Sequence, residues 1–441
     1  MTDGLSPALR LARRRTLQLG VAGTSVIGMT LRGMPLFARQ ATPGATPISG
    51  ATDETFAALD ALVVPLMASW DIPGAQLAIG YGEKLVYSRG FGYADLATGE
   101  PVLPTHLFRI ASTSKPITGV AILTLVQEGR LTLDTPVFPL LALEPAPNAT
   151  IDPRLDEITV GQLLVHAGGW DSAGTGVDPQ YLPWPLVASH ILAAENPAEG
   201  ETLVRYMLGK PLDFDPGTQS SYSNFGFNVL GRVIEKVSGE PYEDYVRNHV
   251  LIPAGITDAV IGGTTLAERV DGEVVYHGAS GDTLRESVYP GEGYVPTGYG
   301  SYYLRSLDAH GGWICSAEDL IRFALAIDGT RGEALLTPEI VTVMETSPRP
   351  VSVGAGAGNT DGGSGLAWNT VAVEGGYEWS HAGALEGSNA SWLFRAPSGI
   401  SIAWTMNTLP VDYNGFFGAL IPELQRITSG IVDWPDTDLF A

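Results

Sequence analysis

The sequence predicts an α+β fold whose sheet is built from chain segments that lie far apart in sequence. Strand-like segments occur near both ends of the 441-residue chain, and the part between them has mostly helical spacing of its apolar residues. Hydrophobic residues make up 44% of the chain, which is enough to fill a sizeable core and excludes a disordered or collagen-like protein.

Residues 53–430 are expected to form the folded domain, after a leader at 1–38 and a flexible linker rich in Ala, Thr and Pro at 39–52. Three consecutive arginines, Arg13 to Arg15, precede a weakly apolar stretch that is too short to span a membrane comfortably. This arrangement is typical of twin-arginine signal peptides. We therefore expect an exported protein, periplasmic or extracellular, with no stable membrane span after leader removal. A disordered cytoplasmic arm is the alternative interpretation of the leader.

Each element of the domain follows from a local pattern. Apolar residues at helical spacing predict helices, short apolar runs predict strands, and glycine-containing turns join strands or end a helix. The helix after the first hairpin is apolar nearly all round, so it is expected to be buried. In chain order, the expected elements are a helix at 53–69, strands at 75–81 and 85–91 joined at Gly82, the buried helix at 113–129, mostly helix over 155–252 with its clearest helix at 226–238 ended by Gly239, a segment without periodicity at 262–303, a helix at 317–328, strands at 377–381, 391–394 and 400–406, and a last helix at 415–428.

Composition excludes several classes of function. With 25 basic and 48 acidic residues, the net charge is −23, and no Lys/Arg-rich stripe follows the leader. Nucleic acid and anionic membranes are therefore disfavoured as partners. The one cysteine, Cys315, forms no intramolecular disulfide and is expected in the core. The seven histidines lack metal-site spacing, so we expect neither a metal nor a cofactor.

Ser112 and Lys115 are the first candidate catalytic residues. They lie three residues apart at the start of the buried helix, a spacing that puts both side chains on one face. A serine hydroxyl needs a neighbouring base to become a good nucleophile, and a lysine whose pKa is lowered by desolvation is such a base. The N–H groups at a helix start also favour a developing oxyanion. The alternative is a helix-capping serine beside a lysine with a buried stem.

Two later segments carry groups suited to the same chemistry. Tyr222 and Asn224 follow about 110 residues downstream; a phenol beside an ammonium relays a proton, and a carboxamide orients both. The run His381-Ala382-Gly383-Ala384 lies on a predicted strand, where Gly383 lets the backbone come close to a ligand. The Gly-x-Ser-x-Gly elbow of α/β-hydrolases is absent from the sequence.

With these segments in view, the chain resembles the serine β-lactamase and D-alanyl-D-alanine-peptidase superfamily, on the class C β-lactamase-related branch that includes esterases and D-aminopeptidases. The resemblance implies a β-lactamase/transpeptidase-like fold, an antiparallel sheet flanked by helices with a helical subdomain at roughly 110–260. It covers nearly all of the expected domain. The segments that carry it run in the family order: 112–115, 158–169, 222–224, 311–320 and 381–383.

The resemblance also implies a role for each site residue. Ser112 would be the acylated nucleophile, and Lys115 and Tyr222 would share the work of base and proton shuttle. Asn224 would position the substrate, and the N–H groups of Ser112 and Ala384 would form the oxyanion hole.

One departure from the family pattern bears on the substrate. The last segment is usually Lys-Thr-Gly, whereas here it is His381-Ala382-Gly383, and no lysine follows Lys236. A histidine is mostly neutral at pH 7, so the fixed cation that binds a substrate carboxylate is missing. We therefore expect esters or amides to be preferred over β-lactams, and pH values near 6 to charge His381 and partly restore carboxylate recognition. Packing within the strand is the alternative role of His381.

Two further features have a mainly structural interpretation. His166 is expected to hold a turn. The five tyrosines between 289 and 303 either line the pocket or anchor a surface loop.

Together these observations predict an exported serine hydrolase that cleaves a small-molecule ester or amide through a Ser112 acyl-enzyme, without metal or cofactor. One alternative is a β-lactamase or D-amino-acid peptidase acting on cell-wall-type substrates. Another is a non-catalytic binding or sensor protein of the same fold, which the complete Ser/Lys/Tyr/Asn set disfavours. The sequence sets no oligomeric state.

Overall fold

The computed structural model describes residues 46–51, 53–279, 281–350 and 364–441. The predicted leader at 1–38 lies outside these residues, as does most of the predicted linker, so export stays a prediction.

The folded part is longer than the sequence indicated at both ends. Strand β1 (Ile48–Ser49) lies within the predicted linker and pairs with β3 (Lys84–Asp95), so the fold begins before residue 53. At the other end, Leu439 N donates to Leu85 O at 2.8 Å, and Asp438 pairs with Arg331 at 2.8 Å. The expected boundary at residue 430 is therefore too early, because Asp438 and Leu439 bind to the folded domain.

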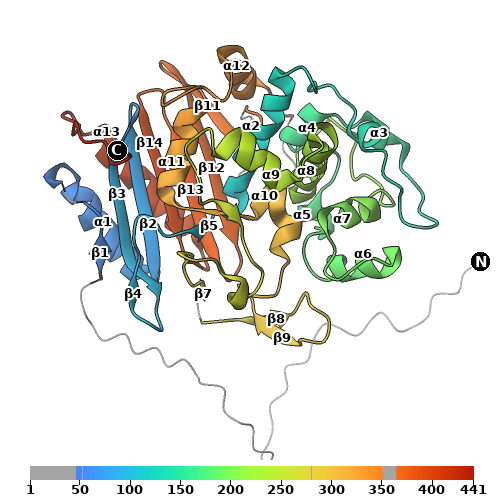
Figure 1. The fold of residues 1–441 in the computed structure, drawn as a ribbon, viewed down its shortest axis with the longest axis horizontal. Coiled ribbons are helices and arrows are strands. Elements are labelled where there is room, and N and C mark those ends of the chain that lie inside the picture. The colour runs from blue at the N-terminus through green and yellow to red at the C-terminus, as the bar shows by residue number, and fades with distance from the viewer. Residues whose placement is uncertain (1–45, 52, 280, 351–363) are drawn as a thin grey trace, which may run out of the picture. The chain divides into compact units, whose positions relative to one another are not determined.

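An eight-stranded antiparallel sheet forms the centre of the domain. Its order is β1-β3-β2-β14-β13-β12-β11, with β4 paired to β3, so the N-terminal hairpin lies directly beside the C-terminal strands (Figure 1). The strands predicted from the sequence are confirmed, and most are longer than expected. The strands not yet delimited are β2 Gly74–Tyr81, β4 Glu100–Pro101, β11 Asn369–Val373, β12 Gly376–Leu385, β13 Asn389–Arg395 and β14 Ile400–Met406.

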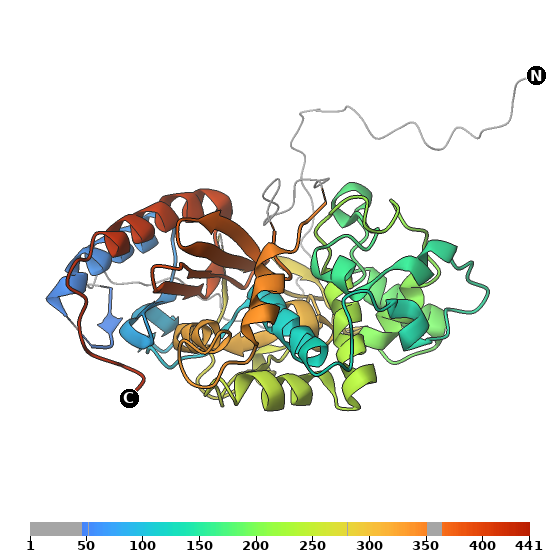
Figure 2. The ribbon, with the colours of Figure 1, turned by 90° about the horizontal axis from the view of Figure 1, so that it is seen from above.

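Helices cover both faces of this sheet (Figure 2). α1 (Ala57–Ser69) and α13 (Tyr413–Ser429) pack together on one face, and α11 (Ala317–Ala326) lies on the other. Successive side chains of a strand point to opposite faces. Trp404 of β14 therefore joins the apolar core under α1 and α13, whereas its neighbour Ala403 joins the core that includes α11.

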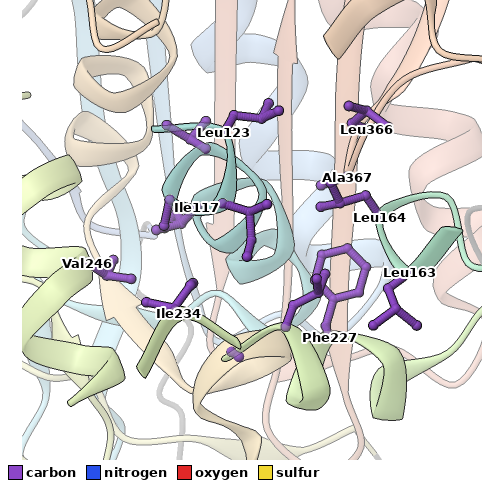
Figure 3. Close-up of a cluster of buried hydrophobic side chains, with 14 of the residues drawn as sticks. Ile117, Leu123, Leu163, Leu164, Phe227, Ile234, Val246, Leu366 and Ala367 are labelled. Carbon is purple, nitrogen blue, oxygen red and sulfur yellow. The ribbon is translucent and has the colours of Figure 1, made fainter. Parts of the chain in front are cut away.

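The expected helical subdomain at 110–260 contains helices packed around α2 (Ser114–Gln127). Every residue of α2 from Ser114 to Leu125 is buried, as its all-round apolar pattern predicted. Figure 3 shows Ile117 of α2 surrounded by apolar side chains of neighbouring elements. The other helices of this part are α3 Val137–Leu141, α4 Val160–Leu164, α5 Ser172–Thr175, α6 Trp184–Leu192, α7 Gly200–Met207, α8 Asn224–Ser238 and α9 Tyr242–Val246.

The end of α8 follows the predicted rule. Gly239 directly follows the helix in the left-handed region, with φ of +81°, where a residue without a Cβ is unstrained. At the other end, the Ser223 hydroxyl accepts a hydrogen bond from Gly226 N at 3.0 Å. Ser223 therefore caps α8, and Tyr222 lies directly before this cap.

Elements of two to five residues are too short to show periodicity in the sequence, and α12 was not predicted although Thr337 and Pro338 mark its start. The short strands and helices are β5 Phe108–Arg109, β6 Val260–Ile261, β7 His277–Gly278, β8 Leu284–Glu286, β9 Tyr294–Pro296, β10 Trp313–Cys315, β15 Thr408–Leu409, α10 Asp308–Gly311, α12 Pro338–Thr346, η2 Glu54–Phe56, η3 Ala111–Thr113, η4 Pro153–Glu157, the π-helix η5 Arg247–Leu251, η6 Leu266–Glu268 and η7 Leu304–Leu307. Cys315 of β10 is buried, as expected.

A buried arginine, Arg109, organises the long segment at 262–303. Its guanidinium donates to Gly298 O at 2.6 Å, to Gly263 O at 2.9 Å and to the Tyr302 hydroxyl at 3.1 Å. Arg109 therefore ties both ends of this segment to β5, three residues before Ser112. No sequence signal marked it, because its partners lie more than 150 residues away.

Aromatic rings complete the surroundings of Arg109. The guanidinium carbon lies 4.3 Å from the centre of the Tyr276 ring and 5.2 Å from that of Tyr299, and the buried Glu273 carboxylate lies 3.8 Å from its Nε. Tyr294, by contrast, is 74% exposed. Tyr299 and Tyr302 thus act as anchors of the loop, the second of the two interpretations that the sequence allowed.

None of the helices in the described residues is both long and apolar enough to cross a membrane.

The Arg109 contacts predict a large effect on stability. Arg109→Met leaves a buried carboxylate without its cation and should cost about 3–5 kcal/mol in the free energy of unfolding. The control Arg426→Met removes an exposed surface ion pair with Glu423, which solvent screens, and should leave the free energy of unfolding nearly unchanged. Urea unfolding followed by tryptophan fluorescence measures both. Equal losses in the two variants would contradict the anchoring role of Arg109.

Candidate functional site

Ser112 lies in η3, the short turn that leads into α2. The preceding residue, Ala111, has φ of +46°, a left-handed conformation that is strained for a residue with a Cβ. Neither η3 nor α2 has a side chain capping its start. The alternative interpretation of Ser112 as a helix cap is therefore wrong, and its hydroxyl is available for other contacts.

Lys115 reaches the Ser112 hydroxyl from the same helix face, as the spacing predicted. Its Nζ lies 3.1 Å from Ser112 Oγ, 2.8 Å from Asn224 Oδ1 and 3.1 Å from the carbonyl oxygen of His310. The side chain is fully buried. Burial holds the pKa of Lys115 well below its usual range, and the charge of Asp178 opposes that shift only in part.

Tyr222 completes the contacts of the serine. Its hydroxyl donates to Ser112 Oγ at 2.7 Å, and Lys115 Nζ lies 4.6 Å from the centre of its ring. Burial raises the pKa of Tyr222 above its usual value, so the phenol keeps its proton at neutral pH. Of the two neighbours of Ser112, Lys115 is therefore the one suited to accept a proton.

His166 supports Tyr222 rather than the serine. Its Nδ1 accepts a hydrogen bond from Ser223 N at 3.2 Å, and its ring centre lies 4.7 Å from that of Tyr222. Its carbonyl oxygen accepts from Ser221 N at 3.0 Å. These contacts fit the expectation that His166 holds a turn.

Both ends of the Asn224 carboxamide are held by protein groups. Oδ1 accepts from Lys115, and Nδ2 donates to Asp178 Oδ2 at 2.8 Å. The expected role of Asn224 in positioning the substrate stays a prediction. Sequence patterns did not reveal Asp178, because it lies in an irregular loop between α5 and α6.

Gly383 lets β12 approach η3 closely. A Cβ on Gly383 would lie 2.1 Å from Ile110 O and 3.0 Å from Ser112 N. The sequence suggested close approach of a ligand here, whereas the structure shows close approach of protein backbone. Ala384, the expected oxyanion donor, directly follows and is partly exposed.

His381 is buried on the face of β12 that Gly383 shares. Burial, with the nearby charge of Lys115, lowers the pKa of His381 to about 3. The expectation that pH values near 6 would charge this histidine is therefore wrong, because its imidazole stays neutral well below that pH.

A cation near His381 comes instead from Arg349. Its Nη1 donates to Asn369 Oδ1 at 2.9 Å, and Asn369 is paired with Ser380, the neighbour of His381. The charge of Arg349 helps to lower the pKa of both His381 and His166. Burial lowers the pKa of Arg349 to about 10, so it stays charged at pH 7. Arg349 belongs to no motif in the sequence, so a cation at this place was not predicted.

The structure thus brings the predicted residues of distant segments together around one hydroxyl. A family model described as beta-lactamase matches residues 59–415. The chain belongs to the beta-lactamase family. The family's serine-hydrolase architecture accounts for the antiparallel sheet flanked by helices, and both the fold and the resemblance predicted from the sequence are confirmed.

Relatives in the beta-lactamase family differ in how much of this chain they match. Esterase EstB of Burkholderia gladioli is 27% identical over 84% of this chain and 94% of its own length. Protein flp of Staphylococcus aureus strain COL is 27% identical over 50% of this chain, a match that spans only 41% of the flp sequence. The D-amino acid amidase of Ochrobactrum anthropi SV3, solved with L-phenylalanine amide, superposes with a TM-score of 0.63 at 23% identity, covering 86% of this chain and 98% of the amidase. The similarity to the amidase shows that the two proteins share a fold.

The contact between β12 and η3 predicts that Gly383→Ala disables the site. The added Cβ must displace the backbone around Ser112, and a shift near 1 Å costs about 10²-fold in reactivity. We expect labelling of Ser112 by a fluorophosphonate probe to slow by that factor. Gly418→Ala on α13 is the matched control, because its Cβ meets nothing within 4 Å. Undiminished labelling of Gly383→Ala would show that this approach is not needed.

Proposed function

We propose that this protein is a serine hydrolase that cleaves small-molecule esters, and related amides, through an acyl-enzyme on Ser112. The observation that carries the proposal is the position of Ser112 Oγ, within hydrogen-bond distance of Lys115 Nζ and the Tyr222 hydroxyl at once. The similarity to esterase EstB over most of both chains supports ester substrates.

The contacts define the order of proton movements in this proposal. Neutral Lys115 takes the proton of the Ser112 hydroxyl as Oγ attacks the substrate carbonyl carbon, and the carbonyl electron pair moves to its oxygen. When the tetrahedral intermediate collapses, the leaving alcohol or amine takes a proton from Tyr222, which Lys115 then restores. Water, deprotonated by the same pair, releases the acid and regenerates Ser112.

The edge of β12 supports the expected oxyanion hole. β11 pairs with β12 only up to Ser380, so beyond it the β11 side of β12 has no strand partner among the described residues. Gly383 brings this stretch against Ser112 N. The N–H groups of Ser112 and Ala384 are thus the proposed donors to the developing oxyanion.

A direct test is intact-mass measurement after exposure to p-nitrophenyl esters of short acids. The wild-type protein should gain the mass of one acyl group, mapped to the Ser112 peptide, and Ser112→Ala should gain none. Lys115→Met and Tyr222→Phe should each slow acylation by about 10²–10⁴-fold. Ser114→Ala is the matched control, because Ser114 is the first residue of α2 and its hydroxyl accepts from Trp313 N at 3.3 Å. Acylation of Ser112→Ala at the wild-type rate would refute the proposal.

A second candidate function has one observation in its favour. The cation of Arg349, close to His381, would suit a substrate that carries a carboxylate, such as a β-lactam or a peptide. Against this, the Arg349 guanidinium already donates to Asn369 Oδ1 and to the carbonyl oxygens of Gly365 and Trp368. Neutral esters therefore remain the preferred substrates in our proposal.

The ratio of nitrocefin to p-nitrophenyl acetate hydrolysis separates the two functions. We expect the wild type to prefer the ester, and Arg349→Gln to leave the ratio unchanged, because protein acceptors already occupy the guanidinium. A charge-assisted bond to the substrate would instead make Arg349→Gln lower the ratio by about 10- to 150-fold. Arg426→Gln on the exposed part of α13 controls for loss of charge alone. A wild type that prefers nitrocefin would favour the β-lactamase alternative.

A further inference from the structure

One residue, Asn224, separates Asp178 from Lys115, the lysine that contacts Ser112. Its Oδ2 accepts from Asn224 Nδ2 at 2.8 Å, and its Oδ1 accepts from its own loop, from Gln180 N at 3.3 Å. Asn224 Oδ1 in turn accepts from Lys115 Nζ at 2.8 Å. A continuous series of hydrogen bonds therefore runs from the carboxylate to the ammonium.

This series fixes the orientation of the Asn224 carboxamide. A carboxylate accepts hydrogen bonds only, so it selects the NH₂ end of the amide and turns the oxygen toward Lys115. With a neutral partner in place of Asp178, the two ends of the amide could exchange, and an NH₂ group would then face the lysine. The lysine would lose one of its three acceptors.

The titratable side chains described around Lys115, other than Asp178, are neutral at pH 7. Among the described residues, Asp178 is the acid whose charge raises the pKa of Lys115 against the effect of burial. Burial holds the pKa of His166, His310 and His381 below the usual value, so all three are neutral at pH 7. Tyr222 keeps its proton for the same reason.

Two other groups lie near this arrangement. Tyr181, whose pKa burial raises, faces Asp178 and stays a neutral phenol. Arg349 acts on His166 and His381 rather than on Lys115. Burial raises the pKa of Asp178, and the hydrogen bonds from Asn224 and Gln180 together with the charge of Lys115 oppose that shift. These contacts favour the carboxylate form, which balances a protonated Lys115.

We propose that Asp178 is a positioning residue for the Ser112 reaction, which acts through Asn224 to orient Lys115 and to supply its counter-charge. This inference rests on the proposed function, because it assigns Asp178 a part in the same proton transfer. It adds a residue that touches neither the substrate nor the serine.

The sign of the expected effect follows from the charge. Lys115 must be neutral to accept the serine proton, so kcat/KM rises with pH through the pKa of Lys115 in the free enzyme. Removing a nearby anion destabilises the ammonium and lowers that pKa. The acid limb of the profile should therefore move to lower pH, and the plateau should fall because the base is weaker and less well oriented.

The test is the pH profile of kcat/KM for p-nitrophenyl acetate in the full chain. For Asp178→Asn, which keeps the shape and removes the charge, we expect the acid limb to move down by about one pH unit. The plateau should fall roughly 10-fold. Asp171→Asn, at the start of α5, is the matched control, since Asp171 accepts from Ser221 Oγ and Gly174 N and none of these contacts involves Asn224. Its acid limb should stay at the wild-type position.

Each result decides the inference. If Asp178→Asn lowers kcat/KM while its acid limb stays in place or moves to higher pH, the role of Asp178 is structural and the inference is overturned. If Asp178→Asn does not fold, Asp178→Ser removes the same charge in a smaller side chain and carries the same expectation. Acyl-enzyme formation on wild-type Ser112 keeps the two proposals apart. If it is present, a failed profile refutes only the role of Asp178, and if it is absent the function itself fails.

Discussion

The site depends on the removal of Lys115 from water. An ammonium in contact with solvent keeps its proton at neutral pH and cannot act as a base, whereas burial disfavours the charged form. The fold achieves this burial by packing α2 against α8 and α10, in an apolar core that also includes residues of the sheet. The three acceptors around Nζ then give the side chain one defined position. Packing and chemistry are thus set by the same helix.

The parts of the site come from segments that meet only in the folded chain. Ser112 and Lys115 lie on α2 and the turn before it, Tyr222 lies at the start of α8, and Gly383 lies on β12. Contacts of the backbone hold these segments in their relative positions. Gly383 brings β12 against η3, and Arg109 secures the polypeptide just before the serine. The strained conformation of Ala111 persists because contacts on both sides hold it.

Local patterns predicted the long elements and the residues that we propose carry the chemistry. The hairpin of β2 and β3, the buried helix α2 and the end of α8 at Gly239 each depend on neighbours in sequence, so the sequence reveals them. The spacing of Ser112 and Lys115, and the order in which the family segments follow one another, also predicted the Ser, Lys and Tyr set. Asp178 and Arg109 were not predicted because their partners Asn224 and Gly298 lie 46 and 189 residues away in sequence. Arg349 was not predicted because no motif marks its segment.

The low pKa of His381 was not predicted from the sequence for a related reason. Its residue type suggested a group that titrates near pH 6, but the degree of burial on β12 sets its pKa, and burial is a property of the assembled sheet. The short strands between 260 and 315 pose the same difficulty. Two or three residues carry no periodicity, and contacts between distant residues, those of Arg109 among them, give that part of the chain its shape.

The strand order has a consequence for how the protein is made. β14 lies between β2 and β13, and its Thr405 pairs with Gln76, 329 residues earlier in sequence. The N-terminal hairpin therefore finds this neighbour only when all of the intervening chain has been synthesised (Figure 1). At about 5–20 residues per second, β2 waits on the ribosome for tens of seconds with an unpaired edge. A nascent chain that stops short of β14 has a sheet divided into two halves. Quality control at the ribosome or by chaperones therefore has a long interval in which to act on this protein.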